Sequence, residues 1–220
     1  MSRPDAVLWD MDGTLLDSEK LWDIPLFELA ERLGGRLSAA ARGAMVGSNI
    51  PTTLDILFTD IGLTPDPEER SEAAAWIDKR MAELLAADPP WQPGALEALA
   101  MVRATGLPTA LVTSTERALT EIALDTLGRH HFDVTLCGDE VDGRNKPDPY
   151  PYRHAAQLLG ADPTRCLAIE DSPTGATSAT AAGCTVLVIP SELPVPPAPR
   201  RHFRTTLLGL TPADLAAPFS

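Results

Sequence analysis

The sequence predicts an α/β protein: a doubly wound parallel sheet with an inserted α-helical cap domain. Short apolar segments with the length of strands alternate with longer segments whose apolar side chains recur every three or four positions. This alternation indicates a parallel sheet that helices cover on both faces. Residues 16–91 show helical spacing almost throughout and no convincing strand, which favours a separate helical domain inserted after the first strand.

The expected strands are short and apolar and lie outside the insertion, at residues 6–9, 108–112, 132–137, 166–169 and 185–189. The helices expected between and beside them cover residues 94–104, 117–127, 150–159 and 174–182. A proline-rich tail from Pro190 predicts an extended surface segment and then a short C-terminal helix. Residues 1–15 and 92–220 thus form the expected core domain, and residues 16–91 form the expected cap.

The chain has an acidic composition that excludes some classes of partner. It has 220 residues, 44% of them hydrophobic, and a formal net charge of −13. This charge argues against nucleic acid and against anionic membrane surfaces, both of which bind basic faces. No apolar run approaches the roughly 18 residues of a membrane span, and the N-terminus lacks the pattern of a signal peptide. The three cysteines form no CxxC pair, so we expect a cytoplasmic protein with reduced thiols.

Polar side chains that can carry chemistry follow the expected strands. In a parallel sheet, ligands bind beyond the carboxyl ends of the strands, so these side chains should meet at one edge. They are Asp10, Asp12 and Thr14 after the first strand, with Gly13 between them, Thr113, Ser114 and Thr115 after the second, Asn145 and Lys146 after the third, and Glu170, Asp171 and Ser172 after the fourth. Four segments therefore deliver carboxylates, hydroxyls and one lysine to the same place.

The carboxylates in this set suit phosphoryl transfer through an aspartyl-phosphate. Asp10 would be the nucleophile, because a carboxylate can split one difficult displacement into two easier steps. A hard cation, Mg²⁺, would bridge the two anions, with Asp10, Asp12 and Asp171 as ligands and Glu170 in support. Asp12 would also protonate the leaving oxygen and later activate water.

The remaining groups suit the binding of a phosphate. Thr113 would donate a hydrogen bond to it, and Lys146 would neutralise its charge. Gly13 would let the backbone turn tightly, and Thr14 and Ser114 would add polar contacts. Thr113, Ser114 and Thr115 could also simply cap the next helix, a role that is compatible with phosphate binding at a helix N-terminus.

These segments, residues 10–18, Thr113, residues 145–149 and residues 170–175, resemble the four ordered motifs of the haloacid dehalogenase superfamily. The similarity is to its phosphatase and beta-phosphoglucomutase-like branch, in which a helical cap is inserted after the first motif. The resemblance implies a Rossmann-like core, a requirement for Mg²⁺ and hydrolysis of a small phosphate ester.

Some positions distinguish between activities within this superfamily. Family dehalogenases lack an aspartate corresponding to Asp12, so its presence favours phosphate chemistry. Phosphomutases of this branch usually carry a histidine and an arginine on the cap, whereas here no histidine precedes His130 and Ile50 aligns with the arginine. Hydrolysis is therefore favoured over mutase activity. In the cap, Ser48 and Asn49 are polar, lie in a turn and are candidates for contact with the substrate.

The leading hypothesis is a Mg²⁺-dependent phosphatase of a small phosphorylated metabolite, such as a sugar or polyol phosphate, acting as a monomer or homodimer. A sugar phosphomutase is the enzymatic alternative. A phospho-aspartate receiver is an alternative from another class, since receivers also combine a parallel sheet with acidic ligands, Thr or Ser and Lys. The helical insertion has no place in a receiver, which makes this alternative the weakest.

Overall fold

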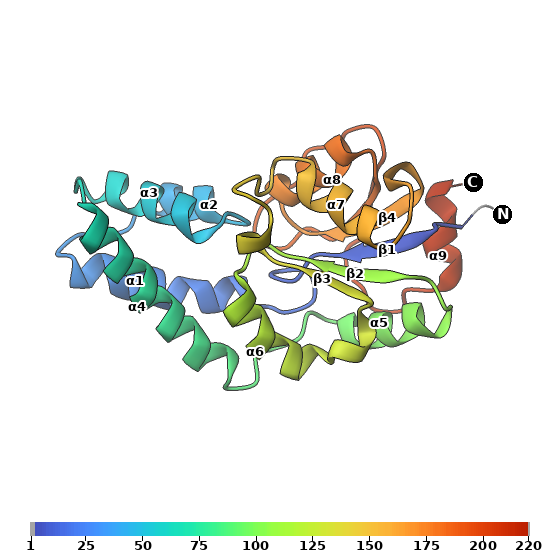
Figure 1. Ribbon diagram of the computed structural model, residues 1–220, viewed down its shortest axis with the longest axis horizontal. Coiled ribbons are helices and arrows are strands. Elements are labelled where there is room, and N and C mark those ends of the chain that lie inside the picture. Colours follow the sequence, from blue (N-terminus) through green and yellow to red (C-terminus); the bar gives the residue numbers. More distant parts are fainter. Residues whose placement is uncertain (1–2, 220) are drawn as a thin grey trace.

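A six-stranded parallel sheet forms the centre of the larger part of the molecule (Figure 1). The computed structural model describes residues 3–219, and within them the strand order is β3-β2-β1-β4-β5-β6. The strands are β1 (Ala6–Trp9), β2 (Thr109–Val112), β3 (Val134–Leu136), β4 (Cys166–Glu170), β5 (Thr185–Val188) and β6 (Arg201–Phe203). The predicted α/β fold with a parallel sheet is confirmed.

The register of the central strands brings their carboxyl ends level with one another. Strand β1 pairs with β2 on one side and β4 on the other, and Trp9 lies opposite both Leu111 and Ile169. All residues of these three strands are buried, as expected for strands covered on both faces. Residues that follow Trp9, Leu111 and Ile169 by one or two positions therefore emerge at a common edge.

Helices cover both faces of the sheet (Figure 1). On one face lie α5 (Ala95–Ala104) and α6 (Arg117–Leu127), and on the other lie α7 (Tyr150–Leu158) and α8 (Pro173–Ala182). Alternate residues of a strand pack into the apolar clusters on opposite faces of the sheet. Val7 and Trp9 belong to one cluster, and Ala6 and Leu8 belong to the other. Short 3₁₀ segments occur at Arg129–His131, Gly138–Glu140, Pro163–Arg165 and Ala217–Phe219.

The chain between β1 and α5 folds into helices that lie beside the sheet rather than on it (Figure 1). Within the described residues these are α1 (Glu19–Arg32), α2 (Ala39–Met45), α3 (Ile50–Asp60) and α4 (Pro67–Leu85), here called the insertion helices. Capping residues mark the N-termini of three of these helices. Asp66 forms a capping box with Glu69 at the start of α4, and Ser38 and Asn49 cap α2 and α3.

Two paired linkers connect the insertion helices to the rest of the chain. The backbone N–H of Asp17 donates to the carbonyl of Pro90 at 2.8 Å, and that of Gln92 donates to Leu15 at 2.9 Å. Leu16 and Trp91 form an antiparallel bridge between these two bonds. The outgoing and returning segments therefore lie side by side and are joined by hydrogen bonds.

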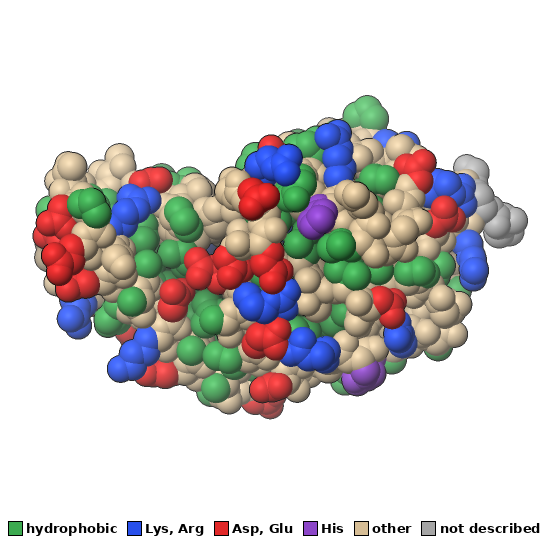
Figure 2. Space-filling view, viewed as in Figure 1, with side chains coloured by type: hydrophobic (Ala, Val, Ile, Leu, Met, Phe, Trp, Pro, Cys, Tyr) green, Lys and Arg blue, Asp and Glu red, His purple; other side chains and the backbone are tan. Residues whose placement is uncertain are grey.

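The insertion helices also share apolar contacts with the sheet side of the molecule. One continuous cluster includes Trp9 of β1, Leu26 of α1, Ile77 of α4 and Leu124 of α6. Helices α4 and α6 are in contact, and Figure 1 shows α4 running toward the first turns of α6. The space-filling view shows acidic side chains gathered across the middle of this face, where α4 meets α6 (Figure 2).

The C-terminal segment differs from the sequence-based expectation. We expected an extended surface segment after Pro190, but Arg201–Phe203 forms β6 and pairs in parallel with β5. Its side chains are mostly exposed, so the sequence carries no apolar signal; the pairing depends on backbone bonds such as Val186 N–H to the Arg200 carbonyl at 2.8 Å. The expected short helix is α9 (Pro212–Ala216).

None of the helices in residues 3–219 has the length and apolar character needed to cross a bilayer.

Candidate active site

A buried lysine and two carboxylates form the centre of the site at the carboxyl edge of the sheet. The Lys146 ammonium donates to Asp10 Oδ1 at 2.6 Å and to Glu170 Oε1 at 2.7 Å. Asp10 directly follows β1, Glu170 ends β4, and Lys146 comes from the loop that precedes α7. The Tyr152 hydroxyl of α7 also donates to Glu170 Oε1, at 2.6 Å. Three parts of the chain thus meet in one charged network.

Asp171 completes a cluster of carboxylates that could hold a cation. One oxygen each from Asp10, Glu170 and Asp171 lies within 4.8 Å of the others. Thr14 donates to Asp171 Oδ1 at 3.2 Å, whereas Oδ2 of both Asp10 and Asp171 is buried without a hydrogen-bond partner. Buried carboxylate oxygens without donors are costly unless a cation accompanies them. Oxygen ligands of this kind fit a hard divalent cation.

The pKa shifts follow from the burial of these like charges. Burial, together with the neighbouring Glu170, raises the pKa of Asp10 to about 8, against the opposing effect of Lys146. Burial and the charges of Asp10 and Glu170 raise the pKa of Asp171 well above its usual value. Burial opposes the charged form of Lys146, but Asp10 and Glu170 outweigh it and raise the pKa of the ammonium. A bound cation would relieve the repulsion between the carboxylates.

Two glycines make room for the charged network. Gly13 has a φ of +84°, and a Cβ at this position would lie 2.2 Å from Asp171 Oδ2. Gly175 lies in the first turn of α8, and a Cβ there would lie 1.8 Å from Glu170 Oε1. Both positions therefore exclude any side chain, because the carboxylates occupy the space that it would need.

Asp12 accepts hydrogen bonds from two parts of the molecule. Thr113 and Thr115, which follow β2, donate to its Oδ2 at 3.3 Å and 2.7 Å. The Ser18 hydroxyl and the Trp22 indole N–H, at the start of the insertion helices, donate to its Oδ1 at 2.7 Å and 3.2 Å. This carboxyl group is therefore held in a fixed position where the sheet edge meets α1.

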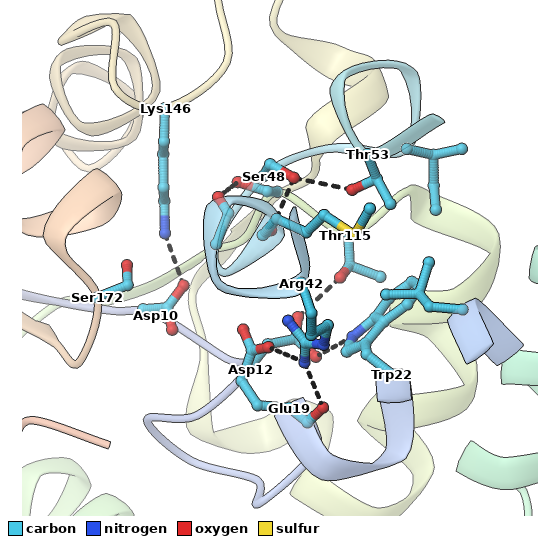
Figure 3. A pocket seen from close by; sticks show the side chains of 15 residues that line it. Asp10, Asp12, Glu19, Trp22, Arg42, Ser48, Thr53, Thr115, Lys146 and Ser172 are labelled. Carbon is cyan, nitrogen blue, oxygen red and sulfur yellow. Dashed lines mark hydrogen bonds and ion pairs between the residues drawn. The ribbon is translucent and has the colours of Figure 1, made fainter. Parts of the chain in front are cut away.

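A pocket lies between the sheet edge and the insertion helices, and Figure 3 shows its side chains. From the sheet side it is lined by Asp10, Asp12, Ser114, Thr115, Lys146 and Ser172. From α1, α2, α3 and the turn before α3 it is lined by Glu19, Trp22, Leu26, Arg42, Met45, Gly47, Ser48, Ile50 and Thr53. The pocket thus joins the charged network to a mixed polar and apolar wall.

An ion-pair cluster occupies the insertion side of this pocket. Arg42 of α2 donates from Nη2 to the Glu19 backbone carbonyl at 2.8 Å and to Glu19 Oε2 at 3.0 Å. Its Nε donates to Asp23 Oδ1. Burial raises the pKa of Glu19 to about 7, against the opposing effect of Arg42. Figure 3 shows the Arg42 side chain reaching down to Glu19, with Asp12 and Trp22 beside it.

Two hydroxyl groups form a second polar feature on the insertion side. Ser48 donates to the Met45 carbonyl at 2.7 Å, and its Oγ lies 2.8 Å from Thr53 Oγ1. Either hydroxyl can be the donor in the contact between them; while the Ser48 proton lies on the Met45 carbonyl, Thr53 donates to Ser48. Asn49 is placed differently: its side chain accepts from Thr52 N–H and caps α3, and it is not among the residues that line the pocket.

The structure brings most of the predicted site residues together but distributes them over different contacts. Asp10, Asp12, Ser48, Ser114 and Lys146 line the pocket. Gly13, Thr14, Thr113, Glu170 and Asp171 lie behind it, where they contact lining residues or each other. The catalytic and binding roles of these residues remain predictions.

Several residues of the site were not found from the sequence. They are Glu19, Trp22, Arg42, Thr53 and Tyr152. Glu19 directly follows the first motif, so its position beside motif residues was an available signal. Arg42 and Thr53 have no such signal, because their contacts depend on how α2 and α3 pack against α1.

Comparison with known proteins identifies the family. The family model for a haloacid dehalogenase-like hydrolase matches residues 4–183. The chain therefore belongs to the haloacid dehalogenase-like hydrolase family, and the resemblance noted in its motifs is confirmed.

Named relatives agree with the expected class of enzyme, a phosphomonoester hydrolase. Hexitol phosphatase B of Escherichia coli (strain K12) is 30% identical over 201 residues, which cover 87% of each chain. Phosphoglycolate phosphatase of Thiobacillus denitrificans is 30% identical over 192 residues, covering 84% of this chain and 82% of the relative. Both names fit the phosphatase and beta-phosphoglucomutase-like branch that the motifs predict.

A solved structure shares the fold over nearly the whole chain. The crystal structure of CbbY from Rhodobacter sphaeroides, in complex with xylulose-(1,5)bisphosphate, matches with a TM-score of 0.82 and 24% identity. The match covers 94% of this chain and 96% of that one. It supports the α/β architecture together with the helices beside the sheet.

Proposed function

We propose that this protein is a Mg²⁺-dependent phosphatase that hydrolyses a small phosphorylated metabolite, a sugar or polyol phosphate, through an aspartyl-phosphate. The observation that carries the proposal is the state of Asp10. Lys146 holds its Oδ1, while its Oδ2 is buried without a hydrogen-bond partner, and the residue clusters with Glu170 and Asp171. A carboxylate that is fixed at one oxygen and free at the other is suited to act as a nucleophile and metal ligand.

The other groups of the sheet edge have matching roles in the proposal. Asp171 and the Asp12 backbone carbonyl would join Asp10 in holding Mg²⁺, which supplies the positive charge that lets a phosphate approach the carboxylates. Lys146 would stabilise charge on the phosphate, and Glu170 holds Lys146 from its other side.

Asp12 is the proposed general acid and base. Its four hydrogen bonds fix the carboxyl group in the lining of the pocket, where it could reach a leaving oxygen. Thr113 and Ser114 remain candidates for contact with the phosphate. Of these two, Ser114 lines the pocket, and Thr113 is engaged with Asp12.

The insertion helices and their linkers, residues 16–91, are proposed to act as a cap. They supply nine of the residues that line the pocket, so they enclose the position that a leaving group would take. A cap in this place excludes bulk water and selects the substrate. The named relatives include phosphatases of a hexitol phosphate and of phosphoglycolate, which are both small phosphate monoesters.

The test is turnover of an aryl phosphate by the wild type, Asp10→Asn and the control Asp125→Asn, an exposed aspartate of α6. We expect release of phosphate that needs Mg²⁺, stops with a chelator and falls at least about 10³-fold in Asp10→Asn. The control should retain wild-type turnover. Wild-type turnover by Asp10→Asn, or turnover in the presence of the chelator, would contradict the proposal.

A further inference from the structure

The positively charged side chains in the pocket already form ion pairs with carboxylates. This limits which leaving groups the pocket can bind. Among the described residues that line the pocket, the cations are Lys146 and Arg42. Lys146 contacts Asp10 and Glu170, and it would serve the transferred phosphate. Arg42 contacts Glu19 and Asp23. No lining cation is therefore left for a second anionic group on the substrate.

Arg42 is too enclosed to exchange these partners easily. Its side chain is 12% exposed and that of Glu19 is 5% exposed, so the pair is largely removed from water. Asp23 remains a second carboxylate partner even when Glu19 binds a proton. An incoming carboxylate or phosphate would have to displace a carboxylate that is held close to the guanidinium, and the displaced group would lose its partner.

The hydroxyl pair on the insertion side presents acceptors rather than donors. The Ser48 proton points to the Met45 carbonyl, and the Thr53 proton points to Ser48. The free lone pairs of both oxygens can therefore accept from a substrate hydroxyl. In this arrangement the acceptor-only oxygens of a carboxylate or a second phosphate find no donor in the pair, and a hydroxyl that turned to donate would give up its present bond.

Apolar side chains complete the same wall. Trp22, Leu26, Met45 and Ile50 line the pocket beside the polar groups. Sugars and polyols combine C–H surface with hydroxyls, so a wall of apolar side chains and acceptors matches both parts of such a molecule.

We propose that the insertion side of the pocket discriminates between leaving groups by charge: the carboxylate partners of Arg42 disfavour a leaving group with a second anionic group, and the hydroxyl pair accepts hydrogen bonds from an uncharged alcohol. This inference rests on the proposed phosphatase function. Thr53 and Asp23 are its specificity-determining residues: Thr53 accepts from the alcohol, and Asp23 keeps Arg42 neutralised.

The first experiment compares kcat/KM of the wild type for three phosphate esters with Mg²⁺. These are sorbitol 6-phosphate, phosphoglycolate and fructose 1,6-bisphosphate. We expect the two esters with a second anionic group to be at least about 10²-fold poorer substrates than sorbitol 6-phosphate. Equal or better turnover of phosphoglycolate or the bisphosphate would overturn the inference while leaving the phosphatase function intact.

The second experiment removes the acceptor. Thr53→Val should lower kcat/KM for sorbitol 6-phosphate about tenfold relative to kcat/KM for an aryl phosphate, which has no alcohol hydroxyls. Thr53→Ser should restore the ratio, because it restores the hydroxyl. Thr52→Val, at an exposed neighbouring threonine, is the control and should leave the ratio unchanged. An equal loss for both substrates in Thr53→Val would contradict the assigned role.

The third experiment removes one of the two carboxylates that neutralise Arg42. Asp23→Asn should raise the ratio of phosphoglycolate to sorbitol 6-phosphate turnover about tenfold, because Arg42 loses one carboxylate. Asp55→Asn is the matched control, since Asp55 pairs with Arg70 at 2.7 Å elsewhere in the insertion. An unchanged ratio in Asp23→Asn would overturn the charge argument. Absence of Mg²⁺-dependent turnover with every ester would instead refute the phosphatase function, and the inference with it.

Discussion

The two sides of the pocket differ in how completely their polar groups are satisfied. At the sheet edge, Asp10 and Asp171 each keep a buried oxygen without a hydrogen-bond partner. On the insertion side, Arg42 is bonded to two carboxylates and the hydroxyls of Ser48 and Thr53 are bonded in series. The unsatisfied side is suited to bind and react, whereas the satisfied side is suited to reject groups that bring the wrong charge.

The largest expected effect tests the sheet edge. Lys146→Met leaves Asp10 and Glu170 buried without the cation between them, so we expect kcat/KM for an aryl phosphate to fall at least about 10³-fold. Lys79→Met changes an exposed lysine of α4 in the same way and should retain activity. Circular dichroism of both variants shows whether the fold is kept. A folded Lys146→Met protein with wild-type kcat/KM would show that this side does not depend on the lysine.

A smaller effect is expected on stability, from alanine substitutions at one helical glycine in each of the two regions. Gly175→Ala places a Cβ against Glu170, so we expect the free energy of unfolding to fall by about 3 kcal/mol. Gly43→Ala, in α2, meets no atom within 4 Å and should be neutral or stabilise by up to about 1 kcal/mol, because alanine favours helix. Urea unfolding measures both variants. Equal effects at the two glycines would contradict the view that the charged network fills the space beside Gly175.

The smallest effect concerns the contact between the two regions. Burial and the charge of Glu116 raise the pKa of Asp78, on α4, to about 6. The pKa of this carboxyl group is higher in the folded than in the unfolded state. The free energy of unfolding therefore falls as pH rises from about 4 through 6, and the full loss is reached above this range. Asp78→Asn cannot ionise, and we expect it to be more stable than the wild type by about 1 kcal/mol at pH 8, after allowance for its partial exposure.

At pH 4 the difference between Asp78→Asn and the wild type should disappear, because the wild-type carboxyl group is then protonated. Urea unfolding at the two pH values measures this change. Asp125→Asn, at an exposed position of α6, is the control and should show no such pH dependence. A stabilisation of the same size at pH 4 and pH 8 would mean that ionisation of Asp78 is not its cause.

The sheet edge was largely predictable from the sequence, for a local reason. Asp10, Thr113 and Asp171 come within two residues of a strand end, and parallel strands bring such positions to one edge whatever the details of packing. Gly13 was predicted for its backbone freedom, and its positive φ agrees, but its contact with Asp171 could not be seen without the fold.

The insertion side was less predictable, because its contacts link helices rather than neighbours in the chain. Arg42 meets Glu19 across 23 positions, and no periodic pattern indicates this pair. Asn49 and Ser48 share a turn and similar chemistry, yet Asn49 caps α3 and Ser48 faces the pocket. Strand β6 was missed for a different reason: its pairing uses backbone groups, which every sequence offers.

The paired linkers also limit how this chain can change in length. The bonds of Asp17 with Pro90 and of Leu15 with Gln92 fix the outgoing and returning segments against each other around the Leu16–Trp91 bridge. A residue added to one linker shifts that register and turns the insertion helices relative to the strand ends. Insertions at the Gly62 turn, which joins α3 to α4 and does not line the pocket, should leave the register intact. Inserted residues should therefore be tolerated at the outer turns between the insertion helices, and not at the linkers that join these helices to the core.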